Sequence, residues 1–162
     1  MAASRQHRLV TEGSRAPDFR LARLDGGEAP LSELLANGPI LLAFFEVTCP
    51  ICQLTFPFLE RLHNPAALAV YGVSQNCPED TRAFARHFGV SFPMLLDREE
   101  DQFPASNAYG ISSVPTLFLI ERDGTITRVI EGWQRKQIEW LGGLAGVSPI
   151  RQGENVPEWK AG

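Results

Sequence analysis

The sequence has few cysteines, no long apolar run and no excess of basic residues. Only three of its 162 residues are cysteine, which is too few for a small domain held together by disulfides. No apolar stretch approaches the roughly 18 residues that a membrane-spanning helix needs. The 19 acidic residues outnumber the 15 Lys and Arg residues, and such a chain without a basic stripe is poorly suited to nucleic acid. We therefore expect no nucleic-acid partner and no membrane span.

The N-terminus lacks the apolar core segment of a signal peptide. This absence predicts a cytoplasmic location, although a chain freed of a signal or anchor would look the same and would belong in the periplasm or at a membrane. A hydrophobic fraction of 44% excludes a disordered chain. We expect one domain over residues 16–144, a flexible N-terminal extension over residues 1–15 and an irregular C-terminal tail over residues 145–162.

Strand and helix patterns alternate along the chain. Apolar runs and turn signals predict strands at 18–24, 39–45, 67–73, 94–96, 116–120 and 125–130. Apolar spacings of three and four predict helices at 31–35, 50–62, 78–88, 99–109 and 134–144. Strand-helix-strand units imply parallel neighbours, and the turn at Asp123-Gly124 makes the last two strands an antiparallel hairpin. The order predicts an α/β fold with a mixed central sheet and helices on both faces.

Two cysteines follow the buried strand at 39–45. Cys49 directly precedes a predicted helix, so its sulfur should lie at the helix N-terminus, where unpaired N–H groups favour the thiolate. Cys52 stands one turn further along and can reach back to close a disulfide. Cys49 can then attack a substrate disulfide, and Cys52 can resolve the mixed disulfide. This spacing at a strand-to-helix junction predicts redox chemistry.

The same two cysteines could instead be structural or form half of a zinc site. Zinc usually needs four ligands, whereas this sequence has no second Cys-x-x-Cys motif and its His63 and His87 are isolated. We therefore predict no metal site, and no cofactor other than the redox-active disulfide between Cys49 and Cys52.

The chain resembles the thioredoxin superfamily, near its TlpA-like and AhpC/TSA-like branch. Besides the Cys49-Pro50-Ile51-Cys52 motif, the resemblance rests on Ala16-Pro17-Asp18-Phe19, on Tyr71-Gly72-Val73-Ser74-Gln75, on the run from Gly110 to Thr116 and on Asp123-Gly124. It covers about residues 16–142. It implies a thioredoxin-like fold and a monomeric thiol–disulfide oxidoreductase that takes electrons from an upstream dithiol donor and reduces protein disulfides.

The resemblance also implies how a substrate is held. The Val114–Pro115 peptide bond is expected to be cis, with the proline loop packed against the cysteine pair. The backbone of Val114 would then pair with an extended substrate, as an added strand does. We assign substrate contacts to Val114, Pro115, Thr48, Pro50 and Ile51 on this basis.

The sequence departs from the superfamily where the second thiol must lose its proton. The position of the buried acid of thioredoxin is Ala43, and the position where TlpA-like reductases often have Glu is Thr55. Thr48 stands where many relatives have Trp. The nearest acid is Glu46, which as a partly buried carboxyl group can accept or donate this proton. A solvated loop carboxylate is the equal alternative for Glu46.

Cys77 follows a strand that is expected to run parallel to the Cys49 strand. Parallel neighbours end at the same sheet edge, so Cys77 should lie on the active-site side. It is either an accessory redox thiol or an ordinary surface cysteine.

Two other functions compete with the predicted reductase. A peroxiredoxin-like thiol peroxidase would carry Pro-x-x-x-Thr-x-x-Cys, and that signature fails at both Cys49 and Cys52. A metal or haem-maturation chaperone with the same fold would need a further ligand beside the two thiolates. His87 is a conceivable ligand, but nothing in the sequence places it near the cysteines.

Overall fold

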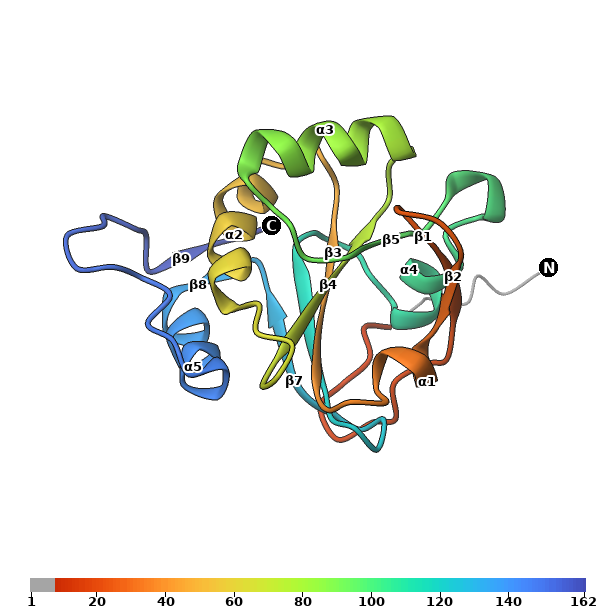
Figure 1. Ribbon diagram of the computed structural model, residues 1–162, viewed down its shortest axis with the longest axis horizontal. Helices are drawn as coiled ribbons and strands as arrows, with labels where there is room; N and C mark the ends of the chain where they lie inside the picture. Colours follow the sequence, from red (N-terminus) through yellow and green to blue (C-terminus); the bar gives the residue numbers. More distant parts are fainter. Residues whose placement is uncertain (1–7) are drawn as a thin grey trace.

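Seven strands form the central sheet, in the order β2-β1-β5-β4-β3-β6-β7. The computed structural model describes residues 8–162 (Figure 1). The strands are β1 (Arg20–Arg23), β2 (Glu28–Pro30), β3 (Ile40–Phe45), β4 (Ala69–Ser74), β5 (Met94–Leu96), β6 (Thr116–Ile120) and β7 (Ile126–Glu131). β3, β4 and β5 are parallel neighbours, whereas the other pairs are antiparallel. The mixed sheet confirms the predicted fold class.

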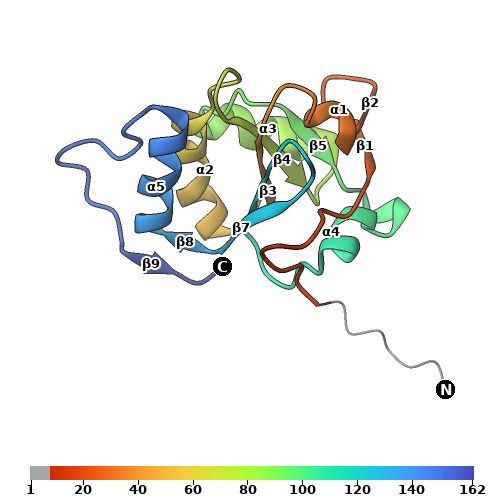
Figure 2. The ribbon, with the colours of Figure 1, turned by 90° about the horizontal axis from the view of Figure 1, so that it is seen from below.

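Helices cover both faces of this sheet. They are α1 (Leu31–Leu34), α2 (Pro50–Leu62), α3 (Pro78–Phe88), α4 (Pro104–Tyr109) and α5 (Arg135–Ala145), with a 3₁₀ turn η1 (Glu99–Asp101) before α4. The core cluster on one face joins α2, α3 and α5, and the cluster on the other face joins α1 and α4. Figures 1 and 2 show α2 and α5 together on one side of the sheet and α4 on the other.

Strand β3 lies at the centre of the fold because all six of its residues are apolar and buried. Leu41, Ala43 and Phe45 face the α2 side, and the alternate residues Ile40, Leu42 and Phe44 face the α1 side. A strand between two helical layers needs such a continuous apolar run. The buried strand thereby fixes the position of its carboxyl end, from which a short loop leads to the N-terminus of α2.

The C-terminal residues pack against the domain. A second, two-stranded sheet pairs β8 (Trp133–Gln134) with β9 (Trp159–Lys160). The indole N–H of Trp133 donates to the Pro157 carbonyl at 2.6 Å. The tail predicted to be irregular thus contains the strand β9. This strand has only two residues, too few for a sequence pattern to predict it.

The N-terminal residues that the structure describes also lie on the domain. The Val10 N–H donates to the Tyr109 carbonyl at 3.1 Å, and the Gly13 N–H donates to the Ile126 carbonyl at 2.7 Å. The extension predicted over residues 1–15 thus contacts the domain at Val10 and Gly13, while its residues 1–7 lie outside the described part of the chain. None of the helices described is both long and apolar enough to cross a bilayer.

Candidate active site

Cys49 is the N-cap residue of α2. Its backbone is extended (φ −72°, ψ 116°), and its Sγ accepts a hydrogen bond from the Cys52 N–H at 3.2 Å. Pro50 follows at the first helical position, where a missing N–H leaves no bond unmade. The Cys49 residue is partly exposed. A donor at the helix N-terminus and access to solvent are the two conditions that favour a reactive thiolate.

Cys52 has the opposite environment. It is fully buried within the cluster that includes Phe56 and Trp133. Burial raises the pKa of the Cys52 thiol far above its ordinary value, and the hydrogen bond with Cys49 adds to this effect. The structure holds both cysteines as free thiols. The pair therefore consists of a partly exposed cysteine at the surface and a buried, neutral thiol beneath it.

The loop before β6 lies directly beside Cys49. The Cys49 S–H donates to the Val114 carbonyl at 3.4 Å, the Val114–Pro115 peptide bond is cis, and Pro115 is buried. This proximity follows from the sheet, because β6 pairs antiparallel with β3 and so begins where β3 ends. The structure thus brings together the motif and the loop, which lie 65 residues apart in sequence.

Glu46 and Thr48 complete the loop between β3 and α2. The Glu46 carboxylate accepts hydrogen bonds from the Thr48 N–H, at 3.2 Å, and from the Thr48 hydroxyl. Its backbone carbonyl accepts the Cys49 N–H at 3.2 Å. Burial and the Cys49 contact raise the pKa of Cys52 most; a hydrogen bond with the Glu46 backbone lowers it, and the charge of the Glu46 carboxylate raises it to a smaller extent. The carboxylate therefore lies close enough to act on the buried thiol electrostatically.

The remaining residues singled out at the motif belong to the start of α2. Pro50 is exposed and Ile51 is half-buried. Thr55 is buried, and its hydroxyl donates to the Ile51 carbonyl at 2.7 Å. A hydroxyl committed to its own helix backbone is not a proton acceptor for Cys52, which leaves Glu46 as the acid of this loop.

Cys77 is the N-cap residue of α3, at the same sheet edge as Cys49. The parallel register pairs Phe45 with Ser74, so both chains leave the sheet there. Cys77 is exposed and its side chain makes no capping hydrogen bond. The nearby Asp80 N–H lowers the pKa of this thiol, but lost hydration and the Asp80 and Glu79 carboxyl groups raise it by more. Cys77 lines a cavity of about 630 Å³ that neither Cys49 nor Cys52 borders.

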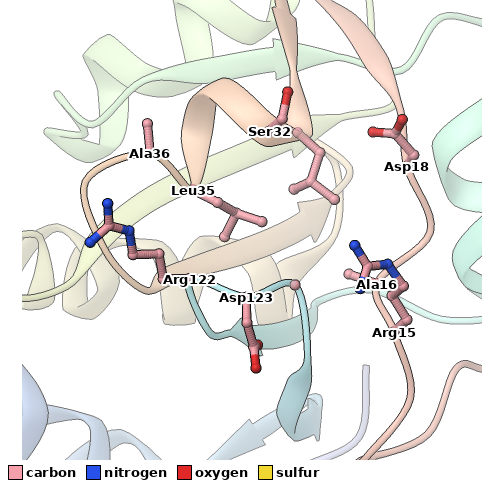
Figure 3. Close-up of a pocket in the computed structure, with 10 residues that line it drawn as sticks. Arg15, Ala16, Asp18, Ser32, Leu35, Ala36, Arg122 and Asp123 are labelled. Atoms are coloured by element: carbon pink, nitrogen blue, oxygen red, sulfur yellow. The ribbon is translucent and has the colours of Figure 1, made fainter.

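The other large cavity lies away from the cysteines. It has a volume of about 530 Å³ and opens between α1 and the β6–β7 turn, near the amino end of β3 (Figure 3). Its charged lining consists of Arg15, Asp18, Arg122 and Asp123. Opposite charges in equal number give it no net preference for an ion of either sign. Within residues 8–162, no cluster of three or more His, Cys, Asp or Glu side chains is arranged to hold a metal.

Gly132 is a site residue that the sequence patterns did not reveal. It joins β7 to β8 with a positive φ of 70°, and its N–H donates to the Pro115 carbonyl at 2.8 Å. It therefore forms the side of the proline loop away from β3. A glycine just after a strand pattern is the only local signal of this position.

Comparison with known proteins places this geometry in a family. Residues 13–129 match the AhpC/TSA family. The chain belongs to the AhpC/TSA family. Among other members, it is 32% identical over 132 residues to the thiol-disulfide oxidoreductase ResA of Geobacillus thermodenitrificans (strain NG80-2), a match that covers 79% of this chain and 74% of that protein.

Solved structures show how the AhpC/TSA family member described here is folded. A thiol:disulfide interchange protein from a Bacteroides species is similar with a TM-score of 0.73 at 20% identity, over 85% of this chain and 91% of that one. The thioredoxin domain of a thiol-disulfide oxidoreductase from Bacteroides vulgatus gives a TM-score of 0.69 at 22% identity, over 76% and 91%. The fold is thus thioredoxin-like, and with the ResA relationship the chain is a thiol–disulfide oxidoreductase, as predicted.

Proposed function

We propose that this chain reduces disulfides of protein substrates, with Cys49 as the nucleophile and Cys52 as the resolving thiol. The observation that carries this proposal is the position of the Cys49 sulfur. It accepts the Cys52 N–H and lies against the Val114 carbonyl. A nucleophile, its resolving partner and a backbone edge for an extended chain therefore meet at one point.

The reaction moves two electrons from the cysteine pair to the substrate. The Cys49 thiolate attacks one sulfur of the substrate disulfide, forming a mixed disulfide and releasing the other substrate sulfur as a thiolate that takes up a proton. The Cys52 thiolate then attacks the Cys49 sulfur. This step releases the second substrate thiol and leaves Cys49 and Cys52 joined. A dithiol donor reduces this disulfide and restores the two thiols, so that no cofactor beyond the pair is used.

Cys52 must lose a proton before it can resolve the mixed disulfide. Its raised pKa keeps it neutral at ordinary pH, so a base is needed at that step. Glu46 is our choice of proton acceptor because its carboxylate is held by Thr48 and its charge reaches Cys52. In the fully reduced chain the hydrogen bond with Cys49 and the charge of Cys49 also raise the pKa of Cys52, and both contributions are lost when Cys49 enters the mixed disulfide.

Substrate binding is assigned to the surface around Cys49. The backbone of Val114 beside Pro115 would pair with an extended segment of the substrate. Thr48, Pro50 and Ile51 would contact the residues that flank the substrate disulfide. A monomer is sufficient for this site, because all of these residues come from one chain. The cytoplasmic location stays a prediction.

Reduction of insulin disulfides with dithiothreitol as the donor tests this function. The intact chain should accelerate the reaction, and Cys49→Ser should abolish the acceleration because it removes the nucleophile. Cys77→Ser is the matched control, since it changes the other cysteine that caps a helix, and it should retain the activity. Equal activity in the intact chain and in Cys49→Ser would refute the proposal.

A further inference from the structure

The C-terminal segment, residues 156–162, runs along the edge of the cysteine site. In the antiparallel pair of β8 and β9, Trp133 stands opposite Lys160 and Gln134 opposite Trp159. The Arg135 N–H donates to the Glu158 carbonyl at 3.0 Å. In Figures 1 and 2 the end of this segment lies beside the N-terminal end of α2.

Past β9 the segment crosses Gly132 and reaches Val114. A Cβ atom added to Gly132 would overlap the Lys160 carbonyl and would lie 3.0 Å from the Gly162 nitrogen. A Cβ atom added to Gly162 would overlap the Val114 carbonyl and would lie 3.2 Å from the Pro115 nitrogen. The two backbones touch directly, and they can do so because neither glycine has a side chain.

These contacts fall on the backbone that the proposed function gives to the substrate. The Val114 carbonyl touched by Gly162 is the group that accepts the Cys49 S–H. Gly132, which residues 160–162 cross, donates its N–H to the Pro115 carbonyl. An extended substrate laid against Val114 would therefore occupy the same space as residues 160–162.

The segment is anchored upstream of the part that covers the site. The Arg61 guanidinium bonds both carboxylate oxygens of Glu154, at 2.6 and 2.9 Å, and one of its nitrogens also donates to the Pro149 carbonyl at 2.8 Å. This contact holds the pKa of Glu154 down at about 2, so the ion pair is intact at neutral pH. With residues 149–158 fixed in this way, residues 160–162 can leave Val114 without undocking the whole tail.

We propose that residues 160–162 are an internal occupant of the substrate groove and determine which disulfides reach Cys49. A protein substrate must displace them to pair with Val114, whereas a small disulfide reaches the exposed side of the Cys49 sulfur without doing so. This inference rests on the proposed function. If the segment occupies the groove in about nine molecules of ten, the apparent affinity for a protein substrate falls about tenfold, because only the open fraction binds.

Removal of residues 160–162 from the chain tests the proposal. The truncated chain keeps Pro157, Glu158 and the Arg61–Glu154 ion pair. Its kcat/KM for insulin should rise about tenfold, and its rate with hydroxyethyl disulfide should stay that of the intact chain. An unchanged ratio of the two rates would overturn the inference, as would an equal rise with both substrates.

A pair of single substitutions gives the same test without shortening the chain. Gly162→Val places a side chain where the Val114 carbonyl lies, so it should displace the segment and raise insulin reduction selectively. Gln152→Val adds a β-branched side chain at an exposed position of the same tail, outside residues 160–162, and should leave both rates unchanged. Equal rates of insulin reduction in the two variants would contradict the proposed role of the contact between Gly162 and the Val114 carbonyl.

Addition of the segment in trans completes the test. A synthetic peptide of residues 156–162 should inhibit insulin reduction by the truncated chain competitively, and a peptide of scrambled sequence should not. Equal inhibition by both peptides would count against the proposed fit. If the intact chain instead reduces neither insulin nor hydroxyethyl disulfide, the proposed function itself fails, which is a different result from an unchanged ratio.

Discussion

Two strand-to-helix junctions lie side by side in this fold, and their cysteines differ sharply. β3 leads to Cys49 and α2, and β4 leads to Cys77 and α3, with a proline as the first helical residue in both. The two strands are parallel neighbours, so both cysteines lie at the same sheet edge. Both cysteines are therefore N-cap residues with an extended backbone and a proline after them.

The surroundings separate the two cysteines. Cys49 accepts the N–H of a second cysteine and lies against the Val114 loop. Cys77 makes no capping bond, is exposed, and has Glu79 and Asp80 in the first turn of its helix. Their negative charge opposes ionisation, as the raised pKa of Cys77 reflects. The two cysteines thus differ in two respects: Cys49 has a partner thiol, and Cys77 has acidic residues in the first turn of its helix.

The largest expected difference between the junctions is in turnover. Cys52→Ser should lower insulin reduction by more than about a hundredfold, because the mixed disulfide at Cys49 can no longer be resolved. Mass spectrometry should find the substrate attached to Cys49 in this variant. Cys77→Ser should turn over like the intact chain, and a comparable loss there would remove the distinction between the junctions.

Alkylation rates compare the two sulfurs directly. At neutral pH iodoacetamide should modify Cys49 about tenfold faster than Cys77, because Glu79 and Asp80 lie in the first turn of the helix that follows Cys77, whereas the first turn of the helix that follows Cys49 has no acidic residue. Peptide mass spectrometry over time measures both rates in one sample. The difference should vanish in urea, and its persistence in the unfolded chain would show that it does not come from the fold.

The pH dependence of stability distinguishes the buried Cys52 from the exposed Cys77. Because its folded-state pKa is raised from 9.0, Cys52 keeps its proton in the folded chain above about pH 9 while the unfolded chain loses it. The free energy of unfolding therefore falls above that pH, by at most about 1.4 kcal/mol per pH unit. Urea unfolding at a series of pH values measures this decrease. Above about pH 9 the free energy of unfolding should fall less steeply with pH in Cys52→Ala than in the intact chain.

Cys77→Ala is the control for that measurement and should keep the slope. Below about pH 9 both chain states hold the Cys52 proton, so the Cys52→Ala and intact curves should run parallel there. A slope that persists in Cys52→Ala would assign it to other groups, such as Tyr109, whose pKa is also raised by burial.

The smallest expected effect concerns the residue three positions before each cysteine. This residue is Glu46 at the first junction and Ser74 at the second. Glu46→Gln should slow resolution by Cys52 about threefold at neutral pH, which is below the usual gain from a general base because solvent also reaches this loop. Stopped-flow measurement of the step across pH should show a shifted profile, and an unchanged profile would exclude Glu46 from the mechanism.

The sequence was sufficient to predict the helices and strands that have a local pattern of their own. Proline at the first helical position and apolar spacings predict α2 as Pro50–Leu62 and α3 as Pro78–Phe88, the bounds that the structure has. The strands β2, β8 and β9 were not predicted, since these two- and three-residue segments lack the apolar run that marks the equally short β5 (Met94–Leu96). Their pairing depends on contacts such as the Trp133–Pro157 hydrogen bond, which no local pattern encodes.

The same division applies to the site. Cys49 and Cys52 are three residues apart, and a helix N-terminus alone brings them together. Val114 was placed beside them only through the resemblance, because its proximity depends on the pairing of β6 with β3. Gly132 and the segment over it were missed, since both depend on how the C-terminal residues fold back onto the domain.

Mapping of disulfides after mild oxidation is the most direct measurement of the difference between the two junctions. The oxidised chain should contain one disulfide, between Cys49 and Cys52, and Cys77 should remain open to alkylation in every molecule. A disulfide that joins Cys77 to Cys49 or Cys52 would contradict the assignment of the redox pair, and so would oxidised protein in which Cys49 and Cys52 are not joined.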